Sequence, residues 1–159
     1  MSRPFTLASL ALLAALAAGP VAAWAQSGRG EREPPAAPTV LGEWSTEDGH
    51  GVIAIEPCGE DLCGRIVGIQ RTPGEPMPKD VHGAPQCGLV IIRKEHPDGD
   101  GSWLGEITDP RDGTVYGAKI WIGRDGNLRL RGFLGLPLLG QTQVWRRFTG
   151  RIGEACGFA

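Results

Sequence analysis

The chain has 159 residues, enough for one domain of ordinary size, and 21% of them are charged. Its formal net charge is −2, and it has no basic stripe of the kind that follows a phosphate backbone. A nucleic-acid partner is therefore not expected.

The first 25 residues have the features of an export signal. Arg3 gives a positive start, Leu7–Ala18 is almost wholly Leu and Ala, and Gly19-Pro20 interrupts any helix. Ala23-Trp24-Ala25 then places small residues at the two positions that a signal peptidase reads. We expect residues 1–25 to be cleaved, with membrane contact only during export and a periplasmic or secreted mature protein. An uncleaved membrane anchor is the alternative, because the apolar run approaches spanning length.

Residues 26–39 (QSGRGEREPPAAPT) are polar, charged and rich in proline. Such a segment buries too little apolar surface to order itself, so we expect a flexible tether. The folded domain is expected over residues 40–149, and residues 150–159 are expected to form a C-terminal tail.

Eight strand-like runs follow one another through the folded part, joined by turns that carry Gly, Asp, Asn or Pro. No window shows sustained helical periodicity, so little helix is expected. Sequential hairpins favour an all-β fold, a single small eight-stranded antiparallel up-and-down barrel, over a sandwich, because a closed barrel has no exposed edges. A Pro/Gly-rich stretch over 72–86 is expected to be an extended loop. The runs are Val40–Thr46, Gly51–Glu56, Cys63–Arg71, Gly88–Lys94, Ser102–Thr108, Thr114–Ile122, Asn127–Leu134 and Gln141–Phe148.

Alternation indicates which side chains fill the barrel. In the seventh run, Leu128, Leu130, Gly132 and Leu134 share one face and oppose a face that carries two arginines. The leucine face is therefore expected to point inward.

Four cysteines in an exported chain indicate disulfides. Cys58 and Cys63 flank a four-residue connection between two strand-like runs, which predicts a cross-strand disulfide. Cys87 and Cys156 are the remaining pair. A zinc site is the rival interpretation, although no pair of histidines matches the cysteine spacing.

Two motifs at the ends of the folded part resemble the calycin superfamily, the lipocalins and their relatives. They are Gly42-x-Trp44 on the first run and Trp145-Arg146-Arg147 on the last. In that superfamily a Trp near the start of strand one is covered by an Arg or Lys from the last strand. The resemblance implies that Trp44 is covered by Arg146 or Arg147, a contact that is favourable between a guanidinium and an indole.

A longer series of blocks resembles the bacterial secreted family known as domain of unknown function 2147. The blocks LGEWST, CGEDLCGRIVG, GEITDPRDGTVYGAKI, GNLRLRGFLG and LLGQTQVWRR match it in order and spacing. The family implies a lipocalin-like barrel exported to the envelope of Gram-negative bacteria, and it brings no established activity. The irregular 72–86 loop and Cys156 depart from its pattern.

The polar side chains do not form a recognisable catalytic motif. His50, His82 and His96 lie in turns or loops with Gly or Pro nearby, and their spacing does not predict a metal site. Asp109 and Asp112 flank Pro110 in a turn, where carboxylates bond the turn backbone. We therefore expect no metal, no cofactor and no enzymatic activity.

The aromatic residues are the remaining candidates for function. An eight-stranded barrel has room either for packed side chains or for one small ligand. If it holds a small apolar or amphipathic ligand, Trp44, Trp103 and Tyr116 are the residues expected nearest to it, with the Tyr116 hydroxyl as the polar contact. The alternative is a structural or interaction protein of the cell envelope with a solid barrel core. A small-molecule enzyme using Gln143, an Arg and Tyr116 is a third hypothesis.

Overall fold

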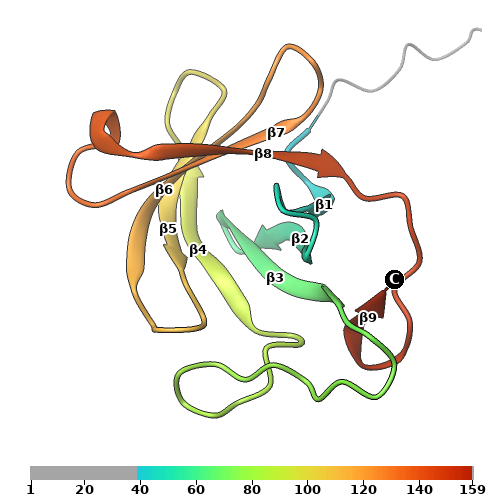
Figure 1. Ribbon diagram of the computed structural model, residues 1–159. Helices are drawn as coiled ribbons and strands as arrows, with labels where there is room; N and C mark the ends of the chain where they lie inside the picture. Colours follow the sequence, from blue (N-terminus) through green and yellow to red (C-terminus); the bar gives the residue numbers. More distant parts are fainter. Residues whose placement is uncertain (1–38, 159) are drawn as a thin grey trace, which may run out of the picture. The chain divides into compact units, whose positions relative to one another are not determined.

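The computed structural model describes residues 39–158, and the predicted export signal and nearly all of the predicted tether lie outside them. Each strand of the barrel pairs antiparallel with the next, and β8 returns to β1 to close eight strands into an up-and-down barrel (Figure 1). The predicted all-β barrel is confirmed. The strands are β1 (Gly42–Ser45), β2 (Gly51–Cys58), β3 (Asp61–Gln70), β4 (Val90–Pro97), β5 (Trp103–Thr108), β6 (Val115–Ile122), β7 (Leu128–Phe133) and β8 (Gln141–Arg147).

Alternate side chains of the strands fill the barrel interior. Ile120 on β6 lies opposite Leu130 on β7, and both are buried, as the leucine pattern predicted. Leu134 differs from that prediction because it is 64% exposed. The reason is that β7 ends at Phe133, and the chain then turns at Gly135 into a loop. The core is made by Val40, Trp44, Ile53, Ile55, Leu62, Ile66, Ile91, Ile92, Ile120, Leu128, Leu130 and Trp145.

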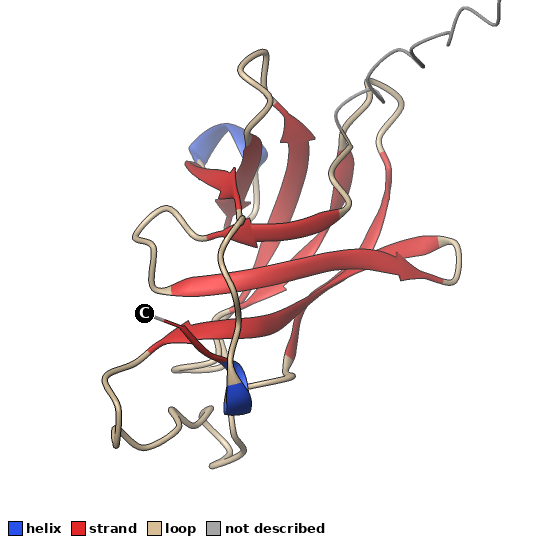
Figure 2. Cartoon of the chain, turned by 90° about the vertical axis from the view of Figure 1, so that its right-hand side faces the viewer, coloured by secondary structure: helices blue, strands red, loops and turns tan. Residues whose placement is uncertain are grey.

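Helical structure in residues 39–158 is limited to two single turns of 3-10 helix, η1 (Pro137–Leu139) and η2 (Glu154–Cys156) (Figure 2). No helix in this part of the chain is long and apolar enough to cross a membrane.

The C-terminal segment folds back onto the barrel. Its last strand, β9 (Gly157–Phe158), pairs in parallel with the end of β3 (Figure 1), and the disulfide Cys87–Cys156 joins it to the segment before β4. The Arg71 guanidinium also donates a 2.8 Å hydrogen bond to the carbonyl of Ala155. The sequence indicated the disulfide but not the strand, because two residues are too few to show alternation.

The second disulfide, Cys58–Cys63, closes the hairpin between β2 and β3. The sequence predicted this pair around a four-residue connection, but the strands run on until Cys58 faces Asp61 across a two-residue turn. Gly59 permits so tight a turn because it adopts a φ of 76°. Cys63 lies opposite Glu56, so the disulfide joins diagonal neighbours whose Cα atoms are 5.8 Å apart.

Candidate functional site

A pocket of about 980 Å³ opens at one end of the barrel. Its wall combines the segment before β1, the β2–β3 hairpin and the turns that follow β4 and β6. The volume lies at the upper end of the range usual for small-molecule sites, and such sites are mostly apolar with a few polar groups. The apolar wall residues are Val40, Leu41, Pro57, Leu62, Trp103 and Ile122, and the charged ones are Glu60, Asp61 and Arg124.

A cation–π contact fixes the segment that forms one side of this pocket. The Arg147 guanidinium lies 3.7 Å from the centre of the Trp44 ring, which is fully buried. Arg147 also donates hydrogen bonds of 2.6 Å to the Leu41 carbonyl and 3.0 Å to the Thr39 carbonyl. Of the two candidate arginines, Arg147 covers the indole, while Arg146 lies opposite Ser45.

Gly42 is required for this contact. Its φ is 110°, a conformation that other residues rarely adopt, and an added Cβ would lie 2.5 Å from the Arg147 Nη1 atom. The Gly-x-Trp motif therefore provides both the indole and the space for the cation that covers it.

Replacing Arg147 with methionine is expected to lower the free energy of unfolding by about 2 kcal/mol, because the cation–π contact and two charge-assisted hydrogen bonds are lost. Arg146→Met is the matched control, expected within about 0.5 kcal/mol of the parent protein. Urea titrations followed by tryptophan fluorescence compare the two variants. Equal losses would show that Arg147 has no special part in closing the barrel.

Of the three predicted ligand-binding residues, Trp103 alone lies in the pocket wall. Trp103 is half-buried and lies in the pocket wall. Trp44 is inside the core, where its indole N–H donates a 2.7 Å hydrogen bond to the Val40 carbonyl. Tyr116 faces Ile107 near the start of β6, whereas Ile122, the residue of β6 that lines the pocket, ends that strand.

Sequence reasoning missed Glu95, a carboxyl group that is completely buried in the barrel. A regular strand would turn Glu95 outward, on the same face as Arg93. The pairing of β4 with β5 slips between Arg93 and His96, where Lys94 adopts a φ of 57°, and this bulge turns Glu95 inward. One signal was available in the sequence, namely the glycine at position 105 within a strand-like run.

The carboxyl group of Glu95 occupies space that Gly105 leaves free. An added Cβ on Gly105 would lie 2.8 Å from the Glu95 Cδ atom and 2.7 Å from the Arg93 carbonyl oxygen. Neither carboxyl oxygen has a hydrogen-bond partner among the residues that the structure describes. Burial, and to a smaller extent the nearby charge of Asp61, raise the pKa of Glu95 to about 8.

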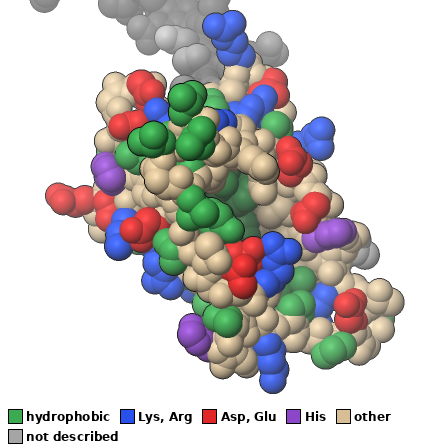
Figure 3. Space-filling view, turned by 60° about the vertical axis from the view of Figure 1, so that its left-hand side comes forward, with side chains coloured by type: hydrophobic (Ala, Val, Ile, Leu, Met, Phe, Trp, Pro, Cys, Tyr) green, Lys and Arg blue, Asp and Glu red, His purple; other side chains and the backbone are tan. Residues whose placement is uncertain are grey.

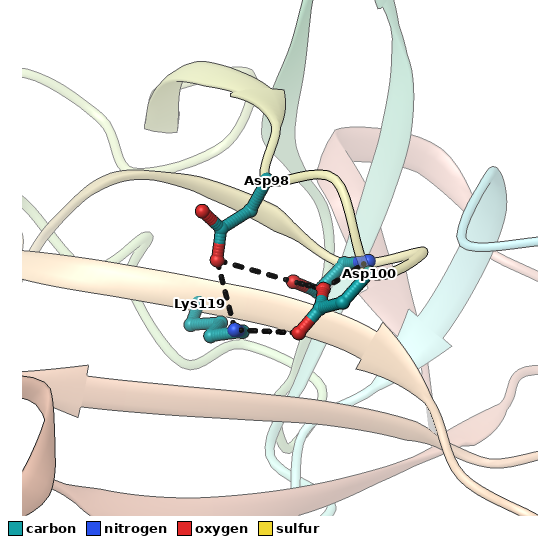
Figure 4. A network of polar contacts seen from close by, with 4 residues as sticks. Asp98, Asp100 and Lys119 are labelled. Atoms are coloured by element: carbon teal, nitrogen blue, oxygen red, sulfur yellow. Dashed lines mark hydrogen bonds and ion pairs between the residues drawn. The ribbon is translucent and has the colours of Figure 1, made fainter.

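The carboxylates of the β4–β5 turn, by contrast, have hydrogen-bond and ion-pair partners within the fold. The Lys119 ammonium lies between two of them, 2.8 Å from Asp98 and 3.1 Å from Asp100 (Figure 4). The Ser102 hydroxyl and Lys119 bond Asp100 and lower its pKa to about 2. The network therefore holds the turn onto β6, and across residues 39–158 no three His, Cys, Asp or Glu side chains gather as a metal site.

The loop between β7 and β8 exposes four leucines, which we call the leucine loop: Leu134, Leu136, Leu138 and Leu139. Leu138 and Leu139 are 84% and 76% exposed. Figure 3 brings the side of the barrel with this loop forward and shows hydrophobic side chains gathered there among scattered charged ones. Arg131 holds the loop in place by donating to the carbonyls of Pro137 and Leu138.

Comparison with known proteins agrees with this architecture. Residues 42–147 match a family described as an uncharacterized protein conserved in bacteria, DUF2147. The chain belongs to this family. The match runs from Gly42, beside the covered indole, to Arg147, the covering cation, so the whole DUF2147 region is the closed barrel.

A solved structure also resembles this DUF2147 protein. Protein HP1028 from the human pathogen Helicobacter pylori, reported to belong to the lipocalin family, superposes with a TM-score of 0.61 at 15% identity. The match covers 71% of this chain and 85% of the Helicobacter protein. At that identity the likeness shows the fold alone. No curated protein matches the chain.

Proposed function

We propose that this protein is an exported bacterial binding protein that holds one small apolar or amphipathic molecule at the mouth of its barrel. The observation that carries the proposal is the pocket of about 980 Å³, whose wall is largely apolar and contains Trp103. Lipocalin-like barrels of eight strands have room for one small ligand at such a place.

Export is supported by two features. The chain has two disulfides, and disulfides form and persist in oxidising compartments outside the cytoplasm. The first 25 residues, which lie outside the described part, have the composition of a cleaved signal.

The four aspartates that form ion pairs in the turns give no support to a catalytic role. Asp98, Asp100 and Asp125 each pair with a cation, and Arg111 does the same for Asp109. Aspartates held in ion pairs of this kind stabilise the turns in which they lie. Tyr116 and Gln143, the groups of the enzyme hypothesis, are not part of the pocket wall.

Decanol is a suitable neutral probe, with binding measured by the change in tryptophan fluorescence. Ile122→Arg is expected to weaken binding by about tenfold or more, because it places a charge on the apolar wall. The matched control is Val115→Arg, at the exposed start of the same strand, which is expected to leave affinity unchanged. Native mass spectrometry of protein from its own bacterial host provides an independent measurement.

Equal affinity in the two variants, or no binding together with a ligand-free native mass, would overturn the proposal. The second outcome would favour the alternative function, an interaction protein of the cell envelope. The leucine loop is the observation that supports this alternative, since exposed apolar clusters mark interaction surfaces.

A further inference from the structure

Glu95 is the one charged residue among the fully buried side chains of the described chain, and its carboxyl oxygens have no partner there. Burying a polar group without a hydrogen bond is costly, and burying an unpaired charge costs more. A group of this kind inside a binding barrel becomes satisfied when a ligand supplies the missing donor. A hydrogen-bond donor from a ligand would therefore satisfy Glu95, because no described residue of the protein donates to its carboxyl oxygens.

The position of Glu95 links it to the pocket. It lies opposite Leu62 on β3, and Leu62 is part of the pocket wall. On the other side its carboxyl group lies over Gly105, two residues after Trp103, which is also in the wall. Glu95 is not itself in the pocket wall, but its cross-strand partner Leu62 is, and its carboxyl group lies over the strand that carries Trp103 into the wall.

The charges around Glu95 favour a cation as that partner. Asp61 lies close enough to influence its charge, and Asp61 and Glu60 both belong to the pocket wall, against the single cation Arg124. On β4 itself the neighbouring cations are engaged elsewhere: Lys94 pairs with Glu106 at 3.0 Å, and Arg93 donates to the Val90 carbonyl. An ammonium group would supply both the positive charge and the N–H donors.

We propose that Glu95 selects ligands that carry an ammonium group on an apolar chain. The chain lies against the apolar pocket wall, and the ammonium passes between Leu62 and Trp103 to donate hydrogen bonds to the Glu95 carboxylate, whose proton goes to solvent. This inference rests on the proposed function, and it adds the chemical class of the ligand.

Three probes of equal chain length, decylammonium, decanol and decanoate, distinguish the role of Glu95 from the proposed binding function. The two ionic probes are used below their micellar concentrations and decanol below its solubility limit. The parent protein is expected to bind decylammonium about tenfold or more tightly than decanol, and decanoate most weakly. Glu95→Gln should remove the preference for decylammonium while changing decanol affinity by less than about threefold. Glu106→Gln, on the outer face of β5, should keep the preference. Glu95→Met provides a second, apolar variant in case the glutamine variant folds poorly.

The other possible results contradict the role of Glu95, the proposed function or both. Equal binding of decylammonium and decanol by the parent protein, or tighter binding of decanoate, overturns the role of Glu95 and leaves the proposed binding function standing. A cation preference that persists in both Glu95 variants also overturns it. Failure of all three probes to bind the parent protein overturns the proposed function and this inference together.

Discussion

Replacing Glu95 with glutamine is expected to stabilise the protein relative to its parent as the pH rises. The folded protein keeps the Glu95 proton up to a pKa of about 8, whereas the unfolded chain loses it near the ordinary value of 4.5. Between these values the folded state binds more protons than the unfolded one, so the free energy of unfolding of the parent falls with increasing pH. The stability that the parent protein gains from holding this proton is fully present below the unfolded pKa. It is lost as the pH approaches the folded pKa.

The expected size follows from the difference between the two pKa values. From about pH 5 to about pH 8.5, the variant should gain about 4 kcal/mol relative to the parent protein, since each pKa unit corresponds to about 1.4 kcal/mol. Urea titrations at a series of pH values, with the disulfides intact, measure this difference. The neutral amide is also buried, but its cost does not vary with pH, so the slope alone reports the carboxyl group.

Glu106→Gln is the control for the titration. Glu106 forms an exposed ion pair with Lys94 and should change stability by less than about 0.5 kcal/mol throughout. A parent protein and Glu95→Gln variant with parallel pH profiles would show that the carboxyl group is hydrated or paired in solution.

Loss of the Cys87–Cys156 disulfide is expected to destabilise the protein more than loss of Cys58–Cys63. The first joins residues 69 positions apart and the second joins residues only 5 apart. In the chain-entropy account, the free energy of unfolding falls by about 4 kcal/mol without the first and about 2 kcal/mol without the second. Double serine variants of each pair, unfolded in urea, provide the comparison.

Removal of the two disulfides should also affect different parts of the structure. Without Cys87–Cys156, β9 retains its two-residue pairing with β3, the Arg71 contact and the packing of Phe158 against Phe148, but no covalent link, so hydrogen exchange at Gly157 and Phe158 should become faster. Larger destabilisation by the hairpin pair would contradict this assignment and would mean that the register of β2 against β3 controls the stability of the barrel.

The sequence predicted the barrel well because its main signals are local. Turns with Gly, Asp and Pro separate runs with a period of two, and each run pairs with the next along the chain. Errors arose where a strand lacks that period. The sequence predicted that the fourth strand ends at Lys94, yet β4 continues to Pro97 beyond a bulge.

The same bulge explains why the candidate site was predicted only in part. A shift of one residue exchanges the two faces of a strand, so alternation continued past Lys94 would place Glu95 on the wrong face. Trp103 was among the predicted residues because aromatic side chains are common in binding sites, but composition could not show that it, and not Trp44 or Tyr116, lies in the pocket wall. The distinction depends on which end of the barrel is open, and that is set by distant segments meeting in space.

The contact between Arg147 and the segment before β1 has an evolutionary consequence. Thr39, Val40 and Leu41 line the pocket, and their carbonyl groups are bound by Arg147 and Trp44. The side chains that close the barrel thus also set the shape of its opening. Selection for a different ligand can change the Thr39 and Leu41 side chains more readily than Val40, because the clamp holds the backbone of all three whereas the Val40 side chain is buried in the core.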